Sequence, residues 1–174
     1  SIGGVPAALD RVGAYAALPE TMQSGAPPTS HDDHVRHRLG AAEALDDATV
    51  EATVDAALAA NPDAQRALTV ADAPGRHARA LAERGVDVTL LDGPAEVDAA
   101  APLLEPTDVA LTTDSLADVA AESFDLVLAV DGAWRQSNAE NRATLAAAAS
   151  ALAPGGAVVS IEPLRDRSTA AVEV

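Results

Sequence analysis

Short runs rich in valine and leucine alternate with alanine-rich stretches from residue 67 onward, and this alternation constrains the fold more than any other feature. Buried strands that alternate with helices are typical of a parallel sheet covered by helices. We expect strands at 67–71, 86–91, 108–112, 124–130 and 156–162 and helices at 75–84, 95–104, 116–121 and 138–152. Pro154, Gly155 and Gly156 should stop the last helix and turn the chain into the fifth strand. Right-handed crossovers then predict a doubly wound α/β sheet, with its functional edge at the carboxyl ends of the strands.

The segment before residue 67 has a helical pattern without alternating strands. The expected helices lie at 6–17, 31–40 and 47–60. Asp46 or Asp47 is the expected N-cap of the third, because a short polar side chain at that place can accept from a free backbone N–H. We therefore expect a helical N-terminal segment at 1–62 and a sheet domain at 63–174.

Composition and charge exclude several classes of protein. The chain has 174 residues, 48% of them hydrophobic but only 2% aromatic, so alanine, valine and leucine must fill its core. A formal net charge of -16 repels phosphate backbones and anionic lipids, which argues against nucleic-acid and membrane-surface partners. The absence of cysteine excludes disulfides, a thiolate nucleophile and a cysteine metal site. Without a signal-peptide start or an apolar run of about 18 residues, the sequence predicts a soluble, cytoplasmic protein.

The balance of charged residues is itself unusual. All 11 basic residues are arginine, and aspartates outnumber glutamates 17 to 10. A strongly hydrated anionic surface indicates adaptation to molar salt, where the Debye length falls to about 3 Å and surface repulsion is screened. GC-rich coding is the alternative, since it also exchanges lysine for arginine, but it does not explain the excess of aspartate. We therefore expect a halophilic, acidic protein.

The most informative segment, 67–92, is a strand, a turn of small residues, a helix and a second strand that ends in Asp92. In nucleotide-binding sheets the turn is small so that backbone amides can approach the ligand. An acid about 20 residues later accepts hydrogen bonds from ribose hydroxyls. Asp92 stands at that place. The alternative is that Asp92 merely starts a loop, as many carboxylates at strand ends do.

Several stretches of the sequence, in order and at the right spacing, resemble one family. Residues 90–98 (LLDGPAEVD) resemble a strand that ends in Asp-Leu-Pro-x-Val, and 125–128 (DLVL) and 151–162 (ALAPGGAVVSIE) resemble its fourth and fifth strands. Residues 18–21 (LPET) and 24–28 (SGAPP) resemble the link from an N-terminal dimerisation and winged-helix domain. The family is that of the class I S-adenosylmethionine-dependent methyltransferases. Within it, the chain is most similar to the acetylserotonin or hydroxyindole type of small-molecule O-methyltransferase.

The resemblance implies a Rossmann-like sheet of strand order 3-2-1-4-5 and S-adenosylmethionine as the cofactor. By position, the turn after the first strand would wrap the methionine part of the cofactor. Its residues are Thr69, Ala71, Asp72, Ala73 and Gly75. Asp92 would hold the ribose. Asp114 and Ser115 would lie beside the adenine, with a plain helix cap as the alternative.

The first-strand turn departs from the family's motif, which reads acid-x-Gly-x-Gly-x-Gly. An ungapped alignment places Thr69, Ala71, Ala73 and Gly75 at those positions. Thr69 therefore replaces the acid that contacts the cofactor's amino group, and alanines replace two of the three glycines. Alanine is strained where a turn needs a positive φ, and its methyl group blocks close approach. Asp72 either substitutes for the missing acid or is itself the motif acid in a loop shorter by about two residues.

The catalytic base is the second departure. In this methyltransferase type a histidine after the fourth strand removes the proton from the substrate hydroxyl, and ungapped counting puts Trp134 there. Tryptophan has an N–H donor and a stacking face but no basic lone pair. Asp131 is close in sequence and is the candidate base, although an ordinary carboxylate with a pKa of about 4 is a weak one. We give His77, in the helix after the turn, little weight.

A short histidine-rich stretch is the one candidate metal site. On a helix, His31 and His34 are neighbours three residues apart and could hold an ion with Asp33 or His37 nearby. The alternative is a polar helix start, with Asp32 and Asp33 near the positive end of the helix dipole. No third ligand stands at a conventional spacing, so we expect no metal site.

These features together predict methyl transfer from S-adenosylmethionine to a small hydroxylated molecule by in-line displacement. The alternative is a catalytically degenerate methyltransferase-fold protein that acts as a binding or assembly subunit, as the replaced glycines and histidine suggest. A nicotinamide-cofactor enzyme is a weaker alternative, because the Gly-x-Gly-x-x-Gly turn is absent. We expect the family's C-terminal strands to be missing and the exposed sheet edge to be covered by a second copy or another partner.

Overall fold

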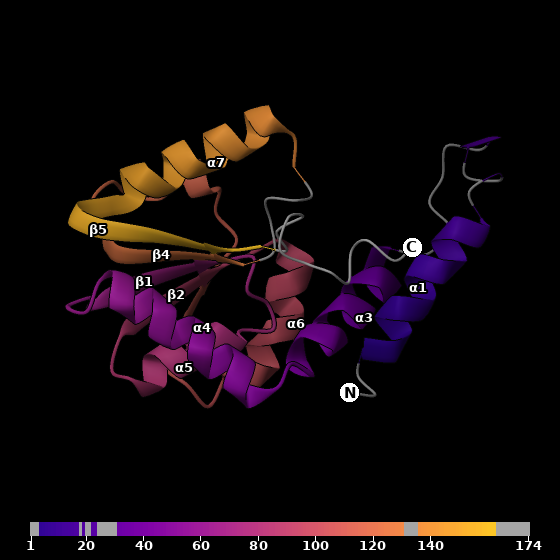
Figure 1. The fold of residues 1–174 in the computed structure, drawn as a ribbon, viewed down its shortest axis with the longest axis horizontal. Helices are drawn as coiled ribbons and strands as arrows, with labels where there is room; N and C mark the ends of the chain where they lie inside the picture. Colours follow the sequence, from indigo (N-terminus) through magenta and orange to yellow (C-terminus); the bar gives the residue numbers. More distant parts are fainter. Residues whose placement is uncertain (1–3, 18, 20–21, 24–30, 131–135, 163–174) are drawn as a thin grey trace.

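The computed structural model describes residues 4–17, 19, 22–23, 31–130 and 136–162 (Figure 1). Its strands are β1 (Arg66–Val70), β2 (Asp87–Leu91), β3 (Ala110–Thr112), β4 (Phe124–Val130) and β5 (Leu152–Ile161). Its helices are α1 (Val5–Ala16), α3 (His31–Glu43), α4 (Asp47–Ala60), α5 (Arg76–Glu83), α6 (Pro94–Leu104), α7 (Asn138–Ala151) and a 3-10 helix, η2 (Leu116–Asp118). In the described part of the chain no helix is long and apolar enough to cross a bilayer.

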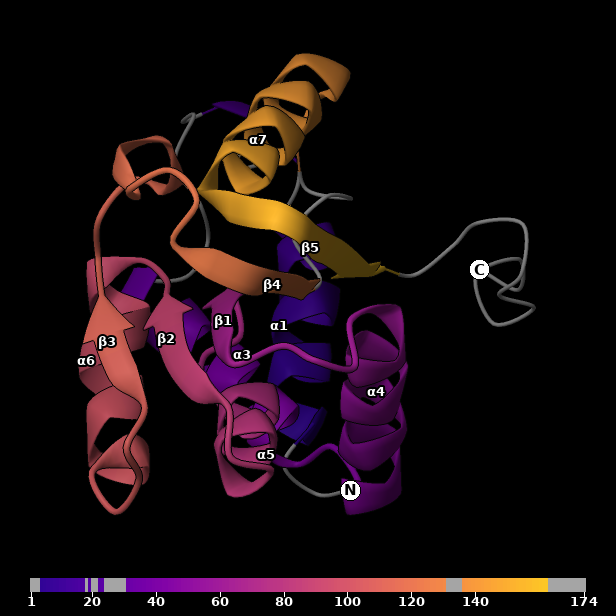
Figure 2. The ribbon, with the colours of Figure 1, turned by 90° about the vertical axis from the view of Figure 1, so that its left-hand side faces the viewer.

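The strands form one parallel sheet in the order β3-β2-β1-β4-β5, which confirms the predicted Rossmann-like topology. Side chains alternate between the two faces of each strand, so neighbouring residues of β4 enter different clusters. Leu126 and Leu128 join the cluster formed with α4, α5 and α6, whereas Val127 packs with Ala148 of α7. Figures 1 and 2 show α7 on one side of the sheet and α4 and α5 on the other.

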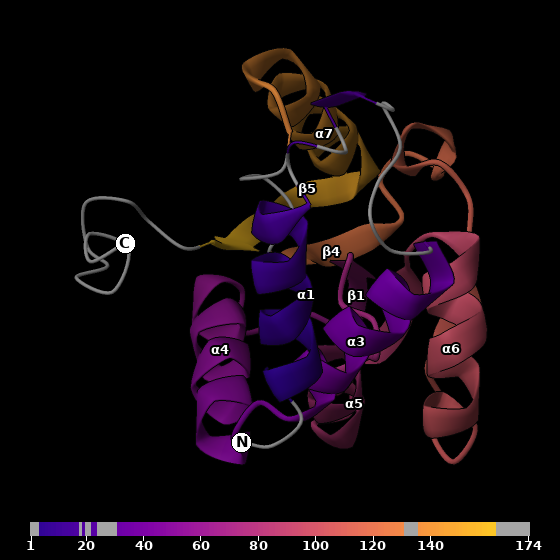
Figure 3. The same cartoon turned by 90° about the vertical axis from the view of Figure 1, so that its right-hand side faces the viewer.

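Two of the N-terminal helices, α3 and α4, belong to the same core as the sheet. Helix α4 packs on α5, α3 on α6, and α1 on α3. Val35 and Leu39 of α3 and Val54 of α4 lie in one apolar cluster with residues of β1 and β2. Figure 3 shows α1 and α3 in front of the carboxyl ends of the strands. The division at residues 62 and 63 stays a prediction, and no gap in the packing marks it.

The expected element boundaries are right to within a few residues, except around the fifth strand. Helix α7 ends at Ala151, before Pro154, because Leu152 is already extended and pairs with Phe124 of β4. The strand therefore begins earlier than predicted, with an irregular register near its start. Gly156 permits this close pairing, since a Cβ there would lie 2.9 Å from the carbonyl oxygen of Asp125. The piece expected at 116–121 is only the short helix η2.

Candidate functional site

The turns after β1 and β2 lie side by side at the carboxyl edge of the sheet. Val70, the last residue of β1, is paired with Leu91, the last residue of β2. The pairing continues one residue further, because the Ala71 amide donates to the Leu91 carbonyl over 3.0 Å. The β1–α5 turn (residues 71–75) and the β2–α6 turn (residues 92–93) are therefore neighbours, as nucleotide-binding sheets require.

The β1–α5 turn has left-handed backbone at both of its ends. Ala71 has a φ of 58° and Gly75 a φ of 92°. The left-handed conformation costs a non-glycine residue about 1–2 kcal/mol, so Ala71 stores strain, as expected for an alanine at a glycine position. Gly75 is fixed twice over, because a Cβ there would also lie 2.8 Å from a methyl carbon of Leu104. Of the motif's positions, Gly75 is thus the one where the structure demands glycine most strongly.

Asp72 turns its side chain inward, under the turn. Asp72 and His77 are each only 4% exposed. One carboxylate oxygen accepts from His77 Nδ1 over 2.6 Å, and the other accepts from the Ala78 amide over 2.8 Å. A negative group at the start of a helix satisfies free N–H groups and interacts favourably with the dipole. Asp72 therefore caps α5 from inside, and His77 is its buried partner.

Asp92 connects the two turns and remains partly exposed. Its carboxylate accepts from the Ala73 amide over 3.1 Å and from the Gly93 amide over 2.8 Å. Burial raises the pKa of the Asp92 carboxyl above its usual value, and the two amide donors oppose that rise. The charge of Glu96 raises the pKa further, whereas that of Arg38 lowers it. Asp92 thus combines a fixed orientation with oxygens that a ligand can still approach.

Thr69 lies in the middle of the sheet with an unsatisfied hydroxyl. The residue is fully buried, and its Oγ1 has no hydrogen-bond partner among the described residues. A buried hydroxyl without a partner costs about 1–3 kcal/mol, so such groups are uncommon and usually have a reason. The position is the one at which the resemblance places contact with the cofactor.

Asp114 and Ser115, after β3, form local hydrogen bonds. Asp114 accepts from the Thr112 hydroxyl over 2.7 Å, and Ser115 caps η2 by accepting from the Ala117 amide over 3.3 Å. Ser115 is therefore a helix cap in this structure, and the role of both residues beside the adenine stays a prediction.

The remaining candidates are the two catalytic residues and the first two histidines of the histidine-rich stretch, and their side chains lie outside the described part of the chain. Asp131 and Trp134 fall in the segment 131–135, outside the described residues. The side chains of His31 and His34 are likewise outside the description. Among the side chains that are described, no group of three or more histidine, aspartate or glutamate residues could hold a metal ion.

One contact at this edge has no signal in the sequence. Arg38 of α3 donates to Glu96 of α6 over 2.6 Å, across 58 residues of chain. The two side chains are 24% and 14% exposed, so water screens the pair only partly. Sequence patterns within one helix could not reveal it, because it depends on how α3 packs against α6.

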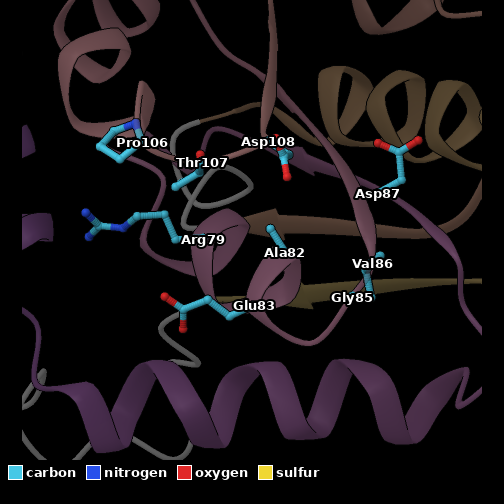
Figure 4. Close-up of a pocket in the computed structure, with 9 residues that line it drawn as sticks. All are labelled: Arg79, Ala82, Glu83, Gly85, Val86, Asp87, Pro106, Thr107 and Asp108. Carbon is cyan, nitrogen blue, oxygen red and sulfur yellow. The ribbon is translucent and has the colours of Figure 1, made fainter.

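A shallow hollow lies at the opposite edge of the sheet (Figure 4). It has a volume of about 460 Å³ and is lined by the segments that precede β2 and β3. The lining includes Arg79, Glu83, Asp87 and Asp108, so it is polar and open rather than apolar. In doubly wound sheets ligands bind at the carboxyl ends of the strands, so we place the candidate site there and not in this hollow.

Solved structures share the fold of this chain, although no family model and no curated protein matches its sequence. An O-methyltransferase family protein from Burkholderia thailandensis has a TM-score of 0.67 at 22% identity, over 96% of this chain and 56% of that one. The chain has a methyltransferase fold. CalS10 of Micromonospora echinaspora, a SAM-bound amino pentose methyltransferase, has a TM-score of 0.62 at 29% identity, over 73% of this chain and 56% of that one. The glycopeptide N-methyltransferase MtfA, solved with S-adenosyl-L-methionine, has a TM-score of 0.55 at 20% identity, over 64% of this chain and 53% of that one.

This methyltransferase-fold chain spans about half the length of these solved structures. Since the match to the Burkholderia protein covers 96% of this chain, it takes in both the sheet and most of the N-terminal helices. Closeness to the acetylserotonin type and adaptation to salt remain predictions from the sequence.

Proposed function

We propose that this chain transfers a methyl group from S-adenosylmethionine to a small hydroxylated molecule. The proposal rests on one observation: backbone N–H groups of the β1–α5 turn and of the start of α5 already donate to carboxylates of the protein itself. Asp72 fills the N-terminus of α5, and Asp92 takes the amide of Ala73. A dinucleotide places its pyrophosphate at that helix N-terminus, where two carboxylates would now repel it. A cofactor with a positive sulfonium and amino group suits the same turn.

The residues fit such a cofactor in three places. Asp92 offers carboxylate oxygens that ribose hydroxyls can reach, as in other nucleotide-binding sheets. The buried Thr69 hydroxyl lacks a partner that the amino-acid part of the cofactor could supply. Ala71 has a left-handed φ, which glycine adopts without strain. The turn therefore keeps this backbone conformation although alanine replaces the motif's glycine.

S-adenosylmethionine supplies an electrophilic methyl group on its sulfonium sulfur. Asp92 and the β1–α5 turn orient the nucleoside and amino-acid parts, so that proximity contributes most of the rate. By the sequence resemblance, Asp131 would be the base that takes the proton of the acceptor hydroxyl, and Trp134 would lie on the acceptor side. The hydroxylated acceptor rests on the sequence resemblance and on the O-methyltransferase neighbour, whereas the glycopeptide N-methyltransferase makes an amine the second acceptor class.

Calorimetric titration tests the cofactor directly. The protein is titrated with S-adenosylmethionine, S-adenosylhomocysteine and NAD, at low salt and in molar salt. We expect micromolar binding of the first two and none of NAD. Asp92→Asn should weaken binding about tenfold or more, because one charge-assisted acceptor is removed. Asp87→Asn, at the exposed opposite end of the same strand, is the matched control.

The same titration separates the alternatives. Absence of heat at millimolar S-adenosylhomocysteine would contradict the proposal and leave the non-catalytic binding subunit as the better explanation. Binding without methyl transfer to phenolic, alcohol or amine acceptors would retain the cofactor and refute the activity.

A further inference from the structure

Helix α6 begins with a capping arrangement that is not completed. Its N-cap is Gly93, and Glu96 stands at the third helical position. A glutamate at that position ordinarily reaches back to the N-cap amide, where it completes a capping box. Here the Gly93 amide donates instead to Asp92, over 2.8 Å.

The chain contains its own reference for the ordinary arrangement. Helix α7 has Ser137 as N-cap and Glu140 at the third position, and Glu140 accepts from the Ser137 amide over 2.7 Å. The two helices therefore place the same residue type at the same position and use it differently.

The glutamate of α6 is paired with a cation from another helix. Arg38 of α3 binds Glu96 Oε1 over 2.6 Å. Glu96 is still close to the turn, since a Cβ built on Gly93 would lie 2.5 Å from its Oε2. An unpaired Glu96 would thus be within a small rotation of the Gly93 amide and would compete with Asp92 for it.

We propose that Arg38 is a positioning residue of the nucleoside site: it holds Glu96 away from the Gly93 amide, so that this amide fixes Asp92 in the orientation that accepts ribose hydroxyls. This inference rests on the proposed function. It extends that function by giving the N-terminal helix α3 a part in cofactor binding. The charged groups around Asp92 are consistent with it, because Glu96 from α6 raises the pKa of Asp92 and Arg38 from α3 lowers it.

Binding of S-adenosylhomocysteine to a set of variants tests the role of Arg38. Arg38→Gln should weaken binding about tenfold, the equivalent of one charge-assisted hydrogen bond. Arg38→Lys should recover most of that loss. The decisive variant is the double change Arg38→Gln with Glu96→Ala, which removes the competitor and should bind within about threefold of the original chain.

Arg79→Gln is the matched control. Arg79 also ties α3 to the sheet domain, but through the last residue of that helix, Glu43, over 3.0 Å. If ion pairs to α3 matter only for packing, Arg79→Gln and Arg38→Gln should weaken binding alike, and the double variant should be no better than Arg38→Gln. Either result would overturn the inference.

A ligand-free measurement separates this inference from the proposed function. In the free protein, Arg38→Gln should change the NMR shift of the Gly93 amide, and adding Glu96→Ala to that variant should restore the shift. An amide shift unchanged by Arg38→Gln would refute the positioning role even if no ligand bound. A changed shift without S-adenosylhomocysteine binding would refute the proposed function instead.

Discussion

The two turns at the carboxyl edge use the same side chain in opposite ways. Asp72 is buried, and helix α5 and His77 take up both of its oxygens. Asp92 is partly exposed, and it receives one amide from each turn. The comparison teaches that Asp72 builds the site whereas Asp92 faces it. The substitutions that follow should separate a large effect on stability at the first turn from an effect on ligand binding at the second.

The largest effect is expected from Asp72→Ala. The change removes the cap of α5 and leaves the buried His77 ring without its partner, so unfolding should cost about 3 kcal/mol less. Urea denaturation followed by circular dichroism measures it. Asp72→Asn keeps one acceptor for the Ala78 amide and should lose less. A free energy within about 0.5 kcal/mol of the original chain would contradict the structural role of Asp72.

Gly75→Ala should have the next largest effect, because it combines backbone strain with the clash against Leu104. We expect a loss of about 2–3 kcal/mol in the free energy of unfolding. Gly85→Ala is a matched control, since its φ of 84° is similar but nothing lies within 4 Å of its Cβ. It should lose only about 1 kcal/mol. Equal losses for the two variants would show that Leu104 yields and that packing does not fix this glycine.

Thr69→Val should stabilise the protein, in contrast to most core substitutions. The two side chains have nearly the same shape, and the change removes a buried hydroxyl without a partner, so we expect a gain of about 1 kcal/mol. The same variant should bind S-adenosylhomocysteine more weakly if the hydroxyl contacts the cofactor. Thermal unfolding with and without ligand measures both effects. A destabilised variant would mean that Oγ1 has a partner in solution.

The smallest effect concerns pH and the second turn. The folded-state pKa of Asp92 is raised, so its carboxyl binds more protons folded than unfolded. By linkage, its contribution to stability should increase as the pH falls through the raised pKa toward the ordinary value. Asp92→Asn should remove this contribution, so the difference in stability between the two proteins should change with pH just above pH 4, the ordinary value being about 3.9. A difference between the two proteins that does not vary with pH would contradict the raised pKa.

Most of the fold could be predicted from the sequence because it follows from local pattern. Alternating apolar runs indicated five strands, right-handed crossovers indicated a doubly wound sheet, and the family resemblance implied its strand order. Asp46, one of two expected caps, is the N-cap of α4 and accepts from the Thr49 amide over 2.9 Å. The start of β5 was placed too late, because Leu152 pairs with Phe124 through a long-range contact that overrides the turn signal of Pro154.

The candidate site was predicted less completely, for a physical reason. Gly75 has the positive φ of a turn glycine and Asp92 directly follows β2, whereas their contact with a cofactor stays a prediction. The inward turn of Asp72 depends on a buried partner, His77, to which sequence reasoning gave little weight.

By itself the sequence determined the order of the elements, the parallel sheet and the edge at which polar side chains gather, because strand periodicity and turn chemistry are local properties. Only the tertiary structure decided what each carboxylate at that edge does. Asp72 caps helix α5, Asp92 accepts hydrogen bonds from both turns, and Glu96 pairs with Arg38, which is 58 residues away in the sequence. Those roles depend on distances between distant segments, and such distances exist only once the helices have packed on the sheet.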